Sequence, residues 1–391
     1  MVDVEKLKEA GIVSIRDYLM DLAKNQKVAR TESGSPSFPI APIAQNKIHE
    51  ALALGHTRYT PSTGVEPLKN AICMKLKREN DIDANANDVI VTSGAMNALY
   101  TTFGAMKSLY KHFVVFIPNP FWTETKVNVE TNGGTVVPYY YKELDDLLVG
   151  DIGVDDLITR KLNIKVFNKK PNIAILINSP HNPTGEILQK HHIDYLTQLT
   201  EKWNMTLISD EAYEHILYDG YKHISPKGDH VVNIYSCSKS YGMAGLRVGY
   251  VHTKKEDLYR AINKEVRCTI NGVNSISQYG AQVVLEDGVQ EYIKNCVDAY
   301  NYRRSMLFDA LHKSPYFQID EMPQGAFYLW AKVIADKTDW EMTSLLLEQG
   351  VGSAPSDVFT IDQSDYHLRF SYACSDEDVE FACNVIRGLK I

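Results

Sequence analysis

Short apolar runs alternate with longer amphipathic stretches along the first two-thirds of the chain. The apolar runs, rich in Val and Ile, are typical of buried strands, and they lie at 88–92, 113–117, 134–138, 173–177, 205–209, 231–235 and 247–252. The amphipathic stretches predict helices at 14–22, 66–79, 96–109, 122–131 and 188–203. Continuous apolar strands that alternate with helices predict an α/β fold, with a mostly parallel sheet covered by helices on both faces.

The pattern changes in the last third of the chain. The residues 285–313 read as one long helix, and they are followed by strands at 326–332 and 367–372 and helices at 340–349 and 376–388. This mixture predicts a smaller α+β domain, which the N-terminal segment joins. We therefore expect a large domain at 45–290 and a small domain made of 1–44 and 291–391.

The composition is that of a soluble globular protein. The chain has 391 residues, 44% apolar and 23% charged, which is long enough for two domains. A formal net charge of −8 argues against a nucleic-acid surface. We find no apolar run long enough to span a membrane, and the charged N-terminus does not resemble a signal peptide. We expect a cytoplasmic protein without nucleic-acid or membrane partners.

The six cysteines are scattered, and no Cys-x-x-Cys motif occurs. This spacing suits neither a zinc site nor a disulfide framework, and it is compatible with a reducing cytosol. We expect no bound metal.

One small-residue turn carries the strongest chemical signal. Lys239 lies in it, directly after an apolar run, and Arg247 follows eight residues later. Small residues let backbone and ligand approach closely. A lysine with a depressed pKa forms a Schiff base with a carbonyl, and an arginine fork suits a phosphate. The pair indicates a phosphorylated aldehyde, pyridoxal phosphate (PLP). The alternative is that Lys239 is one exposed base among 41 Lys and Arg.

Polar turns follow several of the predicted strands, and in such sheets ligands bind at the carboxyl ends of the strands. These turns lie at 93–94, 118–120, 178–180, 210–211 and 236–239, so we expect them to gather at one edge. Asp210, at a strand end, can keep a pyridinium nitrogen protonated, although a helix N-cap explains it equally well. Tyr213 and Asn182 can each hydrogen-bond the phenolic oxygen of the cofactor. Asn182 can equally belong to a plain Asn-Pro turn.

Three further signals are weak when taken singly. Backbone amides at Gly94–Met96, where a strand runs into a helix, can bind phosphate. Trp122 can stack on a ring or simply belong to the core. Arg369 lies in an otherwise apolar strand, which is costly unless the charge is paired. A substrate carboxylate would pair with it, and so would an internal Asp or Glu.

The combined motifs resemble the aspartate aminotransferase superfamily (class I/II) of fold-type-I PLP-dependent enzymes. The motifs are Asn-Pro-Thr-Gly at 182–185, Asp210 with Tyr213, Ser-x-Ser-Lys ending at Lys239, Arg247 and Arg369. Their order and spacing match from about Gly34 to the C-terminus. The motifs around Asn182 and Lys239 are highly specific when they occur together.

The resemblance implies a role for each residue. Lys239 forms the Schiff base and moves the proton, Asp210 holds the pyridine nitrogen, and Asn182 and Tyr213 tune the phenolic oxygen. The phosphate is held by Ser236, Arg247 and the amides of Gly94, Ala95 and Met96, and Trp122 stacks on the ring. The substrate α-carboxylate is bound by Arg369 and the Gly34 backbone, beside Asn182. Tyr59 reaches the phosphate of a neighbouring subunit, which implies a homodimer with shared sites.

Two positions depart from the family pattern. Many relatives carry a small or charged residue where Met96 lies, so only its backbone role is carried over. Arg267 lies in roughly the region of the second arginine that dicarboxylate-specific members use, but the local match is loose.

The predicted activity is the transfer of an amino group from an L-amino acid to a 2-oxo acid by a ping-pong mechanism. The alternative in the same site is a PLP-dependent lyase or synthase that catalyses β- or γ-elimination or cyclisation. A remote alternative is a non-catalytic PLP-binding regulator, which the intact Lys239 argues against.

Overall fold

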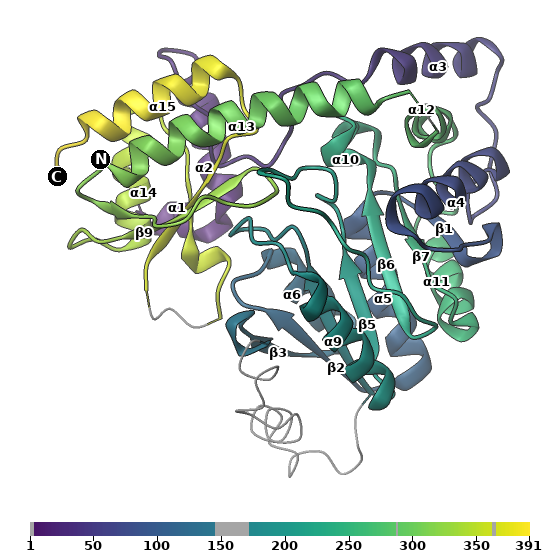
Figure 1. The fold of residues 1–391 in the computed structure, drawn as a ribbon. Helices are drawn as coiled ribbons and strands as arrows, with labels where there is room; N and C mark the ends of the chain where they lie inside the picture. The colour runs from purple at the N-terminus through teal and green to yellow at the C-terminus, as the bar shows by residue number, and fades with distance from the viewer. Residues whose placement is uncertain (1–3, 145–171, 287, 362–364) are drawn as a thin grey trace.

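The computed structural model describes residues 4–144, 172–286, 288–361 and 365–391 and contains two β-sheets (Figure 1). The larger sheet consists of β1 (Val89–Thr92), β2 (Phe113–Pro118), β3 (Thr135–Tyr139), β4 (Asn172–Asn178), β5 (Thr206–Asp210), β6 (Val231–Ser236) and β7 (Gly249–His252). The smaller sheet consists of β8 (Phe317–Gln318), β9 (Tyr328–Val333), β10 (Ala354–Pro355) and β11 (His367–Ser371).

Helices surround both sheets. Those that precede β6 are α1 (Val4–Ala10), α2 (Ile12–Leu22), α3 (Pro42–Ala53), α4 (Glu66–Asn80), α5 (Ala95–Tyr110), α6 (Thr123–Thr131) and α9 (Lys190–Lys202). Those that follow β6 are α10 (Cys237–Ser240), α11 (Glu256–Thr269), α12 (Ser275–Leu285), α13 (Gln290–His312), α14 (Asp339–Glu348) and α15 (Asp376–Gly388). Single 3-10 turns lie at η1 (Ala86–Asp88), η3 (Ala244–Leu246) and η4 (Ser356–Val358).

The larger sheet is mostly parallel, as the sequence predicts. Its strand order is β1-β7-β6-β5-β4-β2-β3. Strands β3, β2, β4, β5 and β6 are parallel, whereas β7 is antiparallel to both β6 and β1. Because β1 is therefore aligned with the parallel set, its carboxyl end lies at the same edge as theirs.

Helices cover both faces of this sheet, because alternate residues of each strand point to opposite faces. In β2, Phe113, Val115 and Ile117 pack against α5, α6 and α11, while Val114 and Phe116 pack against α9. Helices α4 and α12 cover the second face near β1 and β7. The predicted α/β class is confirmed.

The smaller sheet is antiparallel, with the order β10-β11-β9-β8, and α13, α14 and α15 pack on it. Its core cluster also includes Ala212, Tyr213 and Ile216, which follow β5 of the larger sheet. The two sheets are therefore joined by shared packing beside the end of β5. In Figure 1, α13 extends from the α12 side of the molecule to the α15 side.

The helix predicted over 285–313 begins instead at Gln290. Helix α12 ends at Leu285, Glu286 is extended, and Gly288 has a φ of 116°, which a helix does not permit. The pattern also left α3, α11 and α12 unpredicted. In α11, the buried residues Leu258, Ile262 and Val266 recur every fourth position, a signal that could have found it.

The division into domains at 45–290 and at 1–44 with 291–391 stays a prediction. Among the described residues, no helix is long and apolar enough to cross a membrane.

The substitution Ile208→Ala tests the central position of β5, because Ile208 is fully buried in the middle strand of the larger sheet. We expect the free energy of unfolding to fall by about 2–5 kcal/mol in urea titrations. The control is Val127→Ala on α6, where the side chain is 50% exposed, and we expect a change within about 0.5 kcal/mol. Equal effects of the two substitutions would contradict the described core.

Candidate active site

A pocket of about 330 Å³ lies at the carboxyl edge of the larger sheet. Turns that follow β1, β4, β5 and β6 supply one side of it, as the sequence analysis expected for polar turns. The loop at Gly34 and Ser35 and the strands β9 and β11 supply the other side. The pocket is therefore built where the two sheets meet.

Most of the predicted site residues line this one pocket. They are Gly34, Ala95, Met96, Trp122, Asn182, Asp210, Tyr213, Ser236, Lys239, Arg247 and Arg369. Gly94 lies directly beside it, since a Cβ at this position would be 2.6 Å from Arg247 Nη2. Residues that come from all parts of the chain thus meet at a single place.

Lys239 lies on the short helix α10, whose N-cap Ser236 accepts a hydrogen bond from the Ser238 amide. Its Nζ donates a hydrogen bond to the Gly34 carbonyl oxygen at 2.7 Å. Burial, together with the charges of Arg369 and Arg247, lowers the pKa of Lys239 to about 8, against the opposing charge of Asp210. At neutral pH, this amine is therefore unprotonated far more often than an ordinary lysine, as a nucleophile requires.

Asp210 ends β5 and opens the turn that carries Tyr213. Burial raises the pKa of its carboxyl, and with the opposing Ala212 amide, the nearby Glu211 charge and the opposing Lys239 charge the result is about 6. The Ala212 amide donates to Asp210 Oδ1 at 3.2 Å. This places a carboxyl group with an unusual affinity for protons in the pocket.

One end of the pocket is suited to a phosphate. A helix leaves its first amides without intrahelical partners, so those of Ala95 and Met96 at the start of α5 can bind an anion. Gly94 has a φ of 83° and permits the close approach of Arg247. Arg247 is held by the carbonyl oxygens of Ala244 and Ser93, to which its Nη1 and Nη2 donate at 2.9 and 3.2 Å.

The opposite end is suited to a carboxylate. Arg369 is only 1% exposed. Its Nη1 donates to Asn182 Oδ1 at 3.0 Å, and its Nη2 donates to the Glu32 carbonyl oxygen at 2.7 Å. Its Nε has no hydrogen-bond partner within the described ranges. Both described hydrogen-bond partners are neutral oxygens, and the internal Asp or Glu considered above is not among them. The carboxylates of Glu32 and Glu124 interact with this guanidinium only through their charge.

Aromatic rings form the walls between these two ends. Tyr213 Oη lies 2.9 Å from Tyr328 Oη, and the Tyr328 ring lies 4.3 Å from Arg369 Cζ. The centre of the Trp122 ring lies 5.7 Å from the same Cζ atom. Sequence reasoning missed Tyr328, because an aromatic residue in an apolar strand has no distinguishing local signal. It missed Ser35, Asn178, Ala212, Ser238 and Ala244 as well.

Tyr59 and Arg267, which the sequence suggested as possible contacts of the cofactor and the substrate, lie outside the pocket. Tyr59 is 93% exposed and lines a separate cleft with residues 270–275. Arg267 is exposed on α11 and does not line the pocket around Lys239. Neither side chain contributes to the pocket of its own chain.

The residues present fit PLP. This cofactor and an amino-acid substrate require an amine of depressed pKa, a buried carboxyl, an anion site at a helix start and an arginine that can bind a carboxylate. The pocket supplies all four, and among the described residues the Nε of Arg369 has no hydrogen-bond partner. The three residues Glu211, Glu214 and His223 bring ligand atoms within 4.8 Å of one another, as a metal site does. However, Lys75 Nζ lies 2.5 Å from Glu214 Oε2 and already supplies positive charge there.

Comparisons with known proteins agree with this geometry. The family model described as aminotransferase class I and II matches residues 19–386. The aspartate aminotransferase of Bacillus subtilis is 31% identical over 370 residues, which cover 91% of this chain and 89% of that protein.

Solved structures are similar as well. The aspartate aminotransferase of Thermus thermophilus with maleate is 27% identical, has a TM-score of 0.83, and the match covers 99% of this chain and 100% of that one. The aromatic aminotransferase of Pyrococcus horikoshii is 27% identical, with a TM-score of 0.81 and coverage of 96% and 98%.

The pKa of Asp210 leads to a stability prediction for the ligand-free protein. Since its folded-state pKa of about 6 lies above the ordinary 3.8, the fold loses stability as the pH rises from about 4 to 6, and the loss is complete above that window. Asn mimics the protonated acid. We therefore expect Asp210→Asn to increase the free energy of unfolding at pH 8, by on the order of 2 kcal/mol, and to leave it unchanged near pH 3.5. Urea unfolding of wild type and Asp210→Asn at both pH values tests this prediction. An equal increase in the free energy of unfolding at both pH values would contradict the raised pKa of Asp210.

Proposed function

The chain belongs to the aminotransferase class I and II family, and we propose that it uses PLP, bound in the pocket around Lys239, to transfer an amino group between an L-amino acid and a 2-oxo acid. The observation that carries this proposal is the Lys239 amine, whose pKa burial lowers to about 8, set between two anion-binding ends. PLP, when bound, supplies an electron sink for the charge that develops as the substrate loses its α-proton.

Lys239 has two tasks. Its unprotonated Nζ would hold the cofactor through the aldehyde, and the same nitrogen, once free, would serve as the base that moves the α-proton of the substrate. Nearby cations favour this amine as a base, because Arg369 and Arg247 disfavour its charged form.

The other residues hold the reactants in place. Asp210 binds the pyridine nitrogen, and Asn182 and Tyr213 bind the phenolic oxygen. The phosphate is held by Arg247, Ser236 and the amides of Gly94, Ala95 and Met96, while Trp122 stacks on the ring. Fixing both ends of the cofactor presents the substrate Cα–H bond to Lys239 in one orientation.

Arg369 binds the substrate α-carboxylate, assisted by the Gly34 backbone. Asn182 also acts here, since its Oδ1 accepts a hydrogen bond from Arg369 and orients the guanidinium. A planar guanidinium binds a carboxylate through two parallel hydrogen bonds, which sets the direction of the substrate as well as its affinity. The similar proteins named above are an aspartate and an aromatic aminotransferase. We therefore test acidic and aromatic amino acids as the amino donor.

We also propose that the protein is a cytoplasmic homodimer with shared sites and with the two domains given above. Its support is the exposed Tyr59, which lies outside the pocket of its own chain, together with the exposed apolar side chains Leu52 and Leu54 of the α3 region. In the dimer, Tyr59 binds the phosphate in the partner subunit.

The first test is the visible absorption spectrum of the purified protein with PLP, titrated with aspartate, glutamate, alanine and phenylalanine. We expect a visible band in the wild type, its loss in Lys239→Ala, bleaching by at least one amino acid, and recovery with 2-oxoglutarate. A band with release of ammonia and no recovery by an oxo acid would establish the lyase alternative. No band even with added PLP would overturn the proposed function.

Mixing two impaired variants tests the shared sites. Lys239→Ala and Tyr59→Ala chains, denatured and refolded together, form mixed dimers in which one site has both native residues. We expect recovery of about one quarter of the wild-type activity by random pairing. If Tyr59 serves its own chain, the mixture recovers nothing beyond the residual activity of Tyr59→Ala; refolded wild type is the control for yield.

A further inference from the structure

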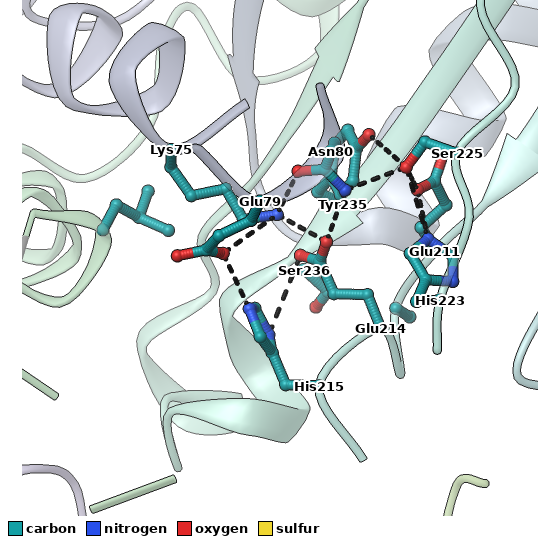
Figure 2. Close-up of polar contacts among 12 residues, drawn as sticks. Lys75, Glu79, Asn80, Glu211, Glu214, His215, His223, Ser225, Tyr235 and Ser236 are labelled. Carbon is teal, nitrogen blue, oxygen red and sulfur yellow. Dashed lines mark hydrogen bonds and ion pairs between the residues drawn. The ribbon is translucent and has the colours of Figure 1, made fainter. Parts of the chain in front are cut away.

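The turn after β5 has two faces with different tasks. Asp210, Ala212 and Tyr213 line the pocket. Glu211 and Glu214 of the same turn do not line it, and Figure 2 shows their side chains within a buried polar cluster. We name the cluster the Glu211 network and define it as the residues Lys75, Asn80, Glu211, Glu214, His223 and Ser225.

Glu211 is 1% exposed, and three side-chain groups contact its carboxylate. His223 Nε2 lies 2.5 Å from Oε2, and the Ser225 hydroxyl donates to the same oxygen. Asn233 Nδ2, from β6, donates to Oε1 at 2.8 Å. Although burial alone would raise the pKa of Glu211, the contacts with His223, Ser225 and Asn233 outweigh it, so the pKa is lowered and the group is an anion.

Glu214 is held from the opposite direction by helix α4. Lys75, which is 0% exposed, donates from Nζ to Glu214 Oε2 at 2.5 Å and to Asn80 Oδ1 at 2.8 Å. Asn80 Nδ2 donates to Glu214 Oε2 at 2.9 Å and to Ser225 Oγ at 2.8 Å, which joins the two halves. Lys75 Nζ also lies 4.6 Å from the centre of the Tyr235 ring.

Burying this many charges contributes little net stability to a fold, because the cost of desolvating the charges offsets most of the attraction between them. What a densely hydrogen-bonded network does achieve is a preferred geometry, since these side chains find their partners only in one arrangement. Of the defined members, His223 keeps one ring nitrogen, Nδ1, without a hydrogen-bond partner in the described residues. Here the two carboxylates belong to the turn that presents Asp210 and Tyr213. Their partners come from α4, β6 and the 223–225 loop, so three separate elements fix this turn from behind.

We propose that the Glu211 network is the positioning device of the pocket, and that Lys75 and Glu211 are positioning residues that hold the turn from Asp210 to Glu214 in its cofactor-binding orientation. This inference rests on the proposed function. It assigns a task to residues that touch neither cofactor nor substrate. The fixed negative charge of Glu211 lies one residue from Asp210 and favours protons on the pocket side of the turn.

Two single substitutions disturb the Glu211 network to different degrees. Glu211→Gln keeps the shape and the acceptor oxygen but loses the charge. Lys75→Met keeps the length of the side chain but removes the cation 2.5 Å from the buried Glu214 carboxylate, whose basic partner among the described residues is then only the more distant His215 Nδ1 at 3.8 Å. It also removes the partner of Glu79 at 3.7 Å, so it is the more costly change. The double variant Lys75→Met with Glu214→Gln removes both charges of that pair and is expected to lie closer to wild type than Lys75→Met alone.

The chain offers a matched control in Arg304. It is 2% exposed, donates to Asp219 Oδ2 at 2.8 Å and to the Pro323 carbonyl oxygen at 2.7 Å, and its Cζ lies 4.2 Å from the Tyr218 ring centre. Arg304→Met therefore removes a buried cation with the same kinds of partners, none of which lines the pocket.

Three readouts test the proposal. The first is the dissociation constant of PLP, which we expect to rise about tenfold in Glu211→Gln and further in Lys75→Met. The second, in the cofactor-free protein, is amide hydrogen exchange of residues 211–214, expected to accelerate about tenfold in both. The third is the pH midpoint of the visible band, expected to fall in Glu211→Gln because a negative charge is lost. Arg304→Met is expected to change each by less than about twofold.

The outcomes separate this inference from the proposed function. If wild type binds PLP but Glu211→Gln changes neither the dissociation constant, nor the exchange rates, nor the midpoint, the positioning role is refuted. The same holds if Arg304→Met changes them as much, because the effect is then general destabilisation. If Lys75→Met fails to fold, Glu211→Gln and the double variant decide. If wild type binds no PLP, the proposed function fails, and the exchange measurement still tests the network.

Discussion

The pocket depends on keeping charged groups partly out of water at one edge of a sheet. Burial lowers the pKa of Lys239 and raises that of Asp210, so each group is shifted towards the protonation state that it adopts least readily in water. Arg247 and Arg369 add to the shift of Lys239 and mark the two anion-binding ends. Because these shifts need a low dielectric, the aromatic walls of Tyr213, Tyr328 and Trp122 are as necessary as the charges.

The end of β5 is where the two sheets meet. Its turn contributes Asp210 to the pocket, Tyr213 to the core of the smaller sheet, and Glu211 and Glu214 to the buried network. A shift of this turn would disturb all three at once, which explains why it is fixed from so many directions. Rigid placement is what a site needs when its chemistry depends on the orientation of a single C–H bond.

The smaller sheet completes a site that the larger sheet cannot form alone. Arg369 comes from β11 and Tyr328 from β9, and the two strands pair directly, with Arg369 opposite Trp330. The Gly34 carbonyl oxygen accepts a hydrogen bond from Lys239, and a Cβ at Gly34 would lie 2.3 Å from Tyr328 Oη. Glycine at this position therefore allows the N-terminal segment, the smaller sheet and Lys239 to approach one another.

The sequence by itself determined the alternation of strands and helices and which polar residues follow each strand. Both are local properties: the apolar period reports burial, and the end of a parallel strand places a side chain at the binding edge. Lys239, Asp210 and Asn182 could be predicted for this reason, together with a resemblance that spans most of the chain. Arg369 lies within β11 instead, and it was predicted from its place in an apolar strand and from the same resemblance. Helix α12 was missed, because buried polar residues such as Ser277 and Gln278 hide its apolar face.

Only the tertiary structure decided the network behind the pocket. In the sequence, Lys75 is one more base in an amphipathic helix, and Glu214 lies 139 residues away. Nothing local distinguishes a buried, paired lysine from an exposed one, because pairing depends on how α4 packs against the end of β5. The same holds for Tyr328, whose place beside Arg369 and Tyr213 arises from the meeting of the two sheets. Contacts between distant segments depend on packing, and packing is a property of the whole fold.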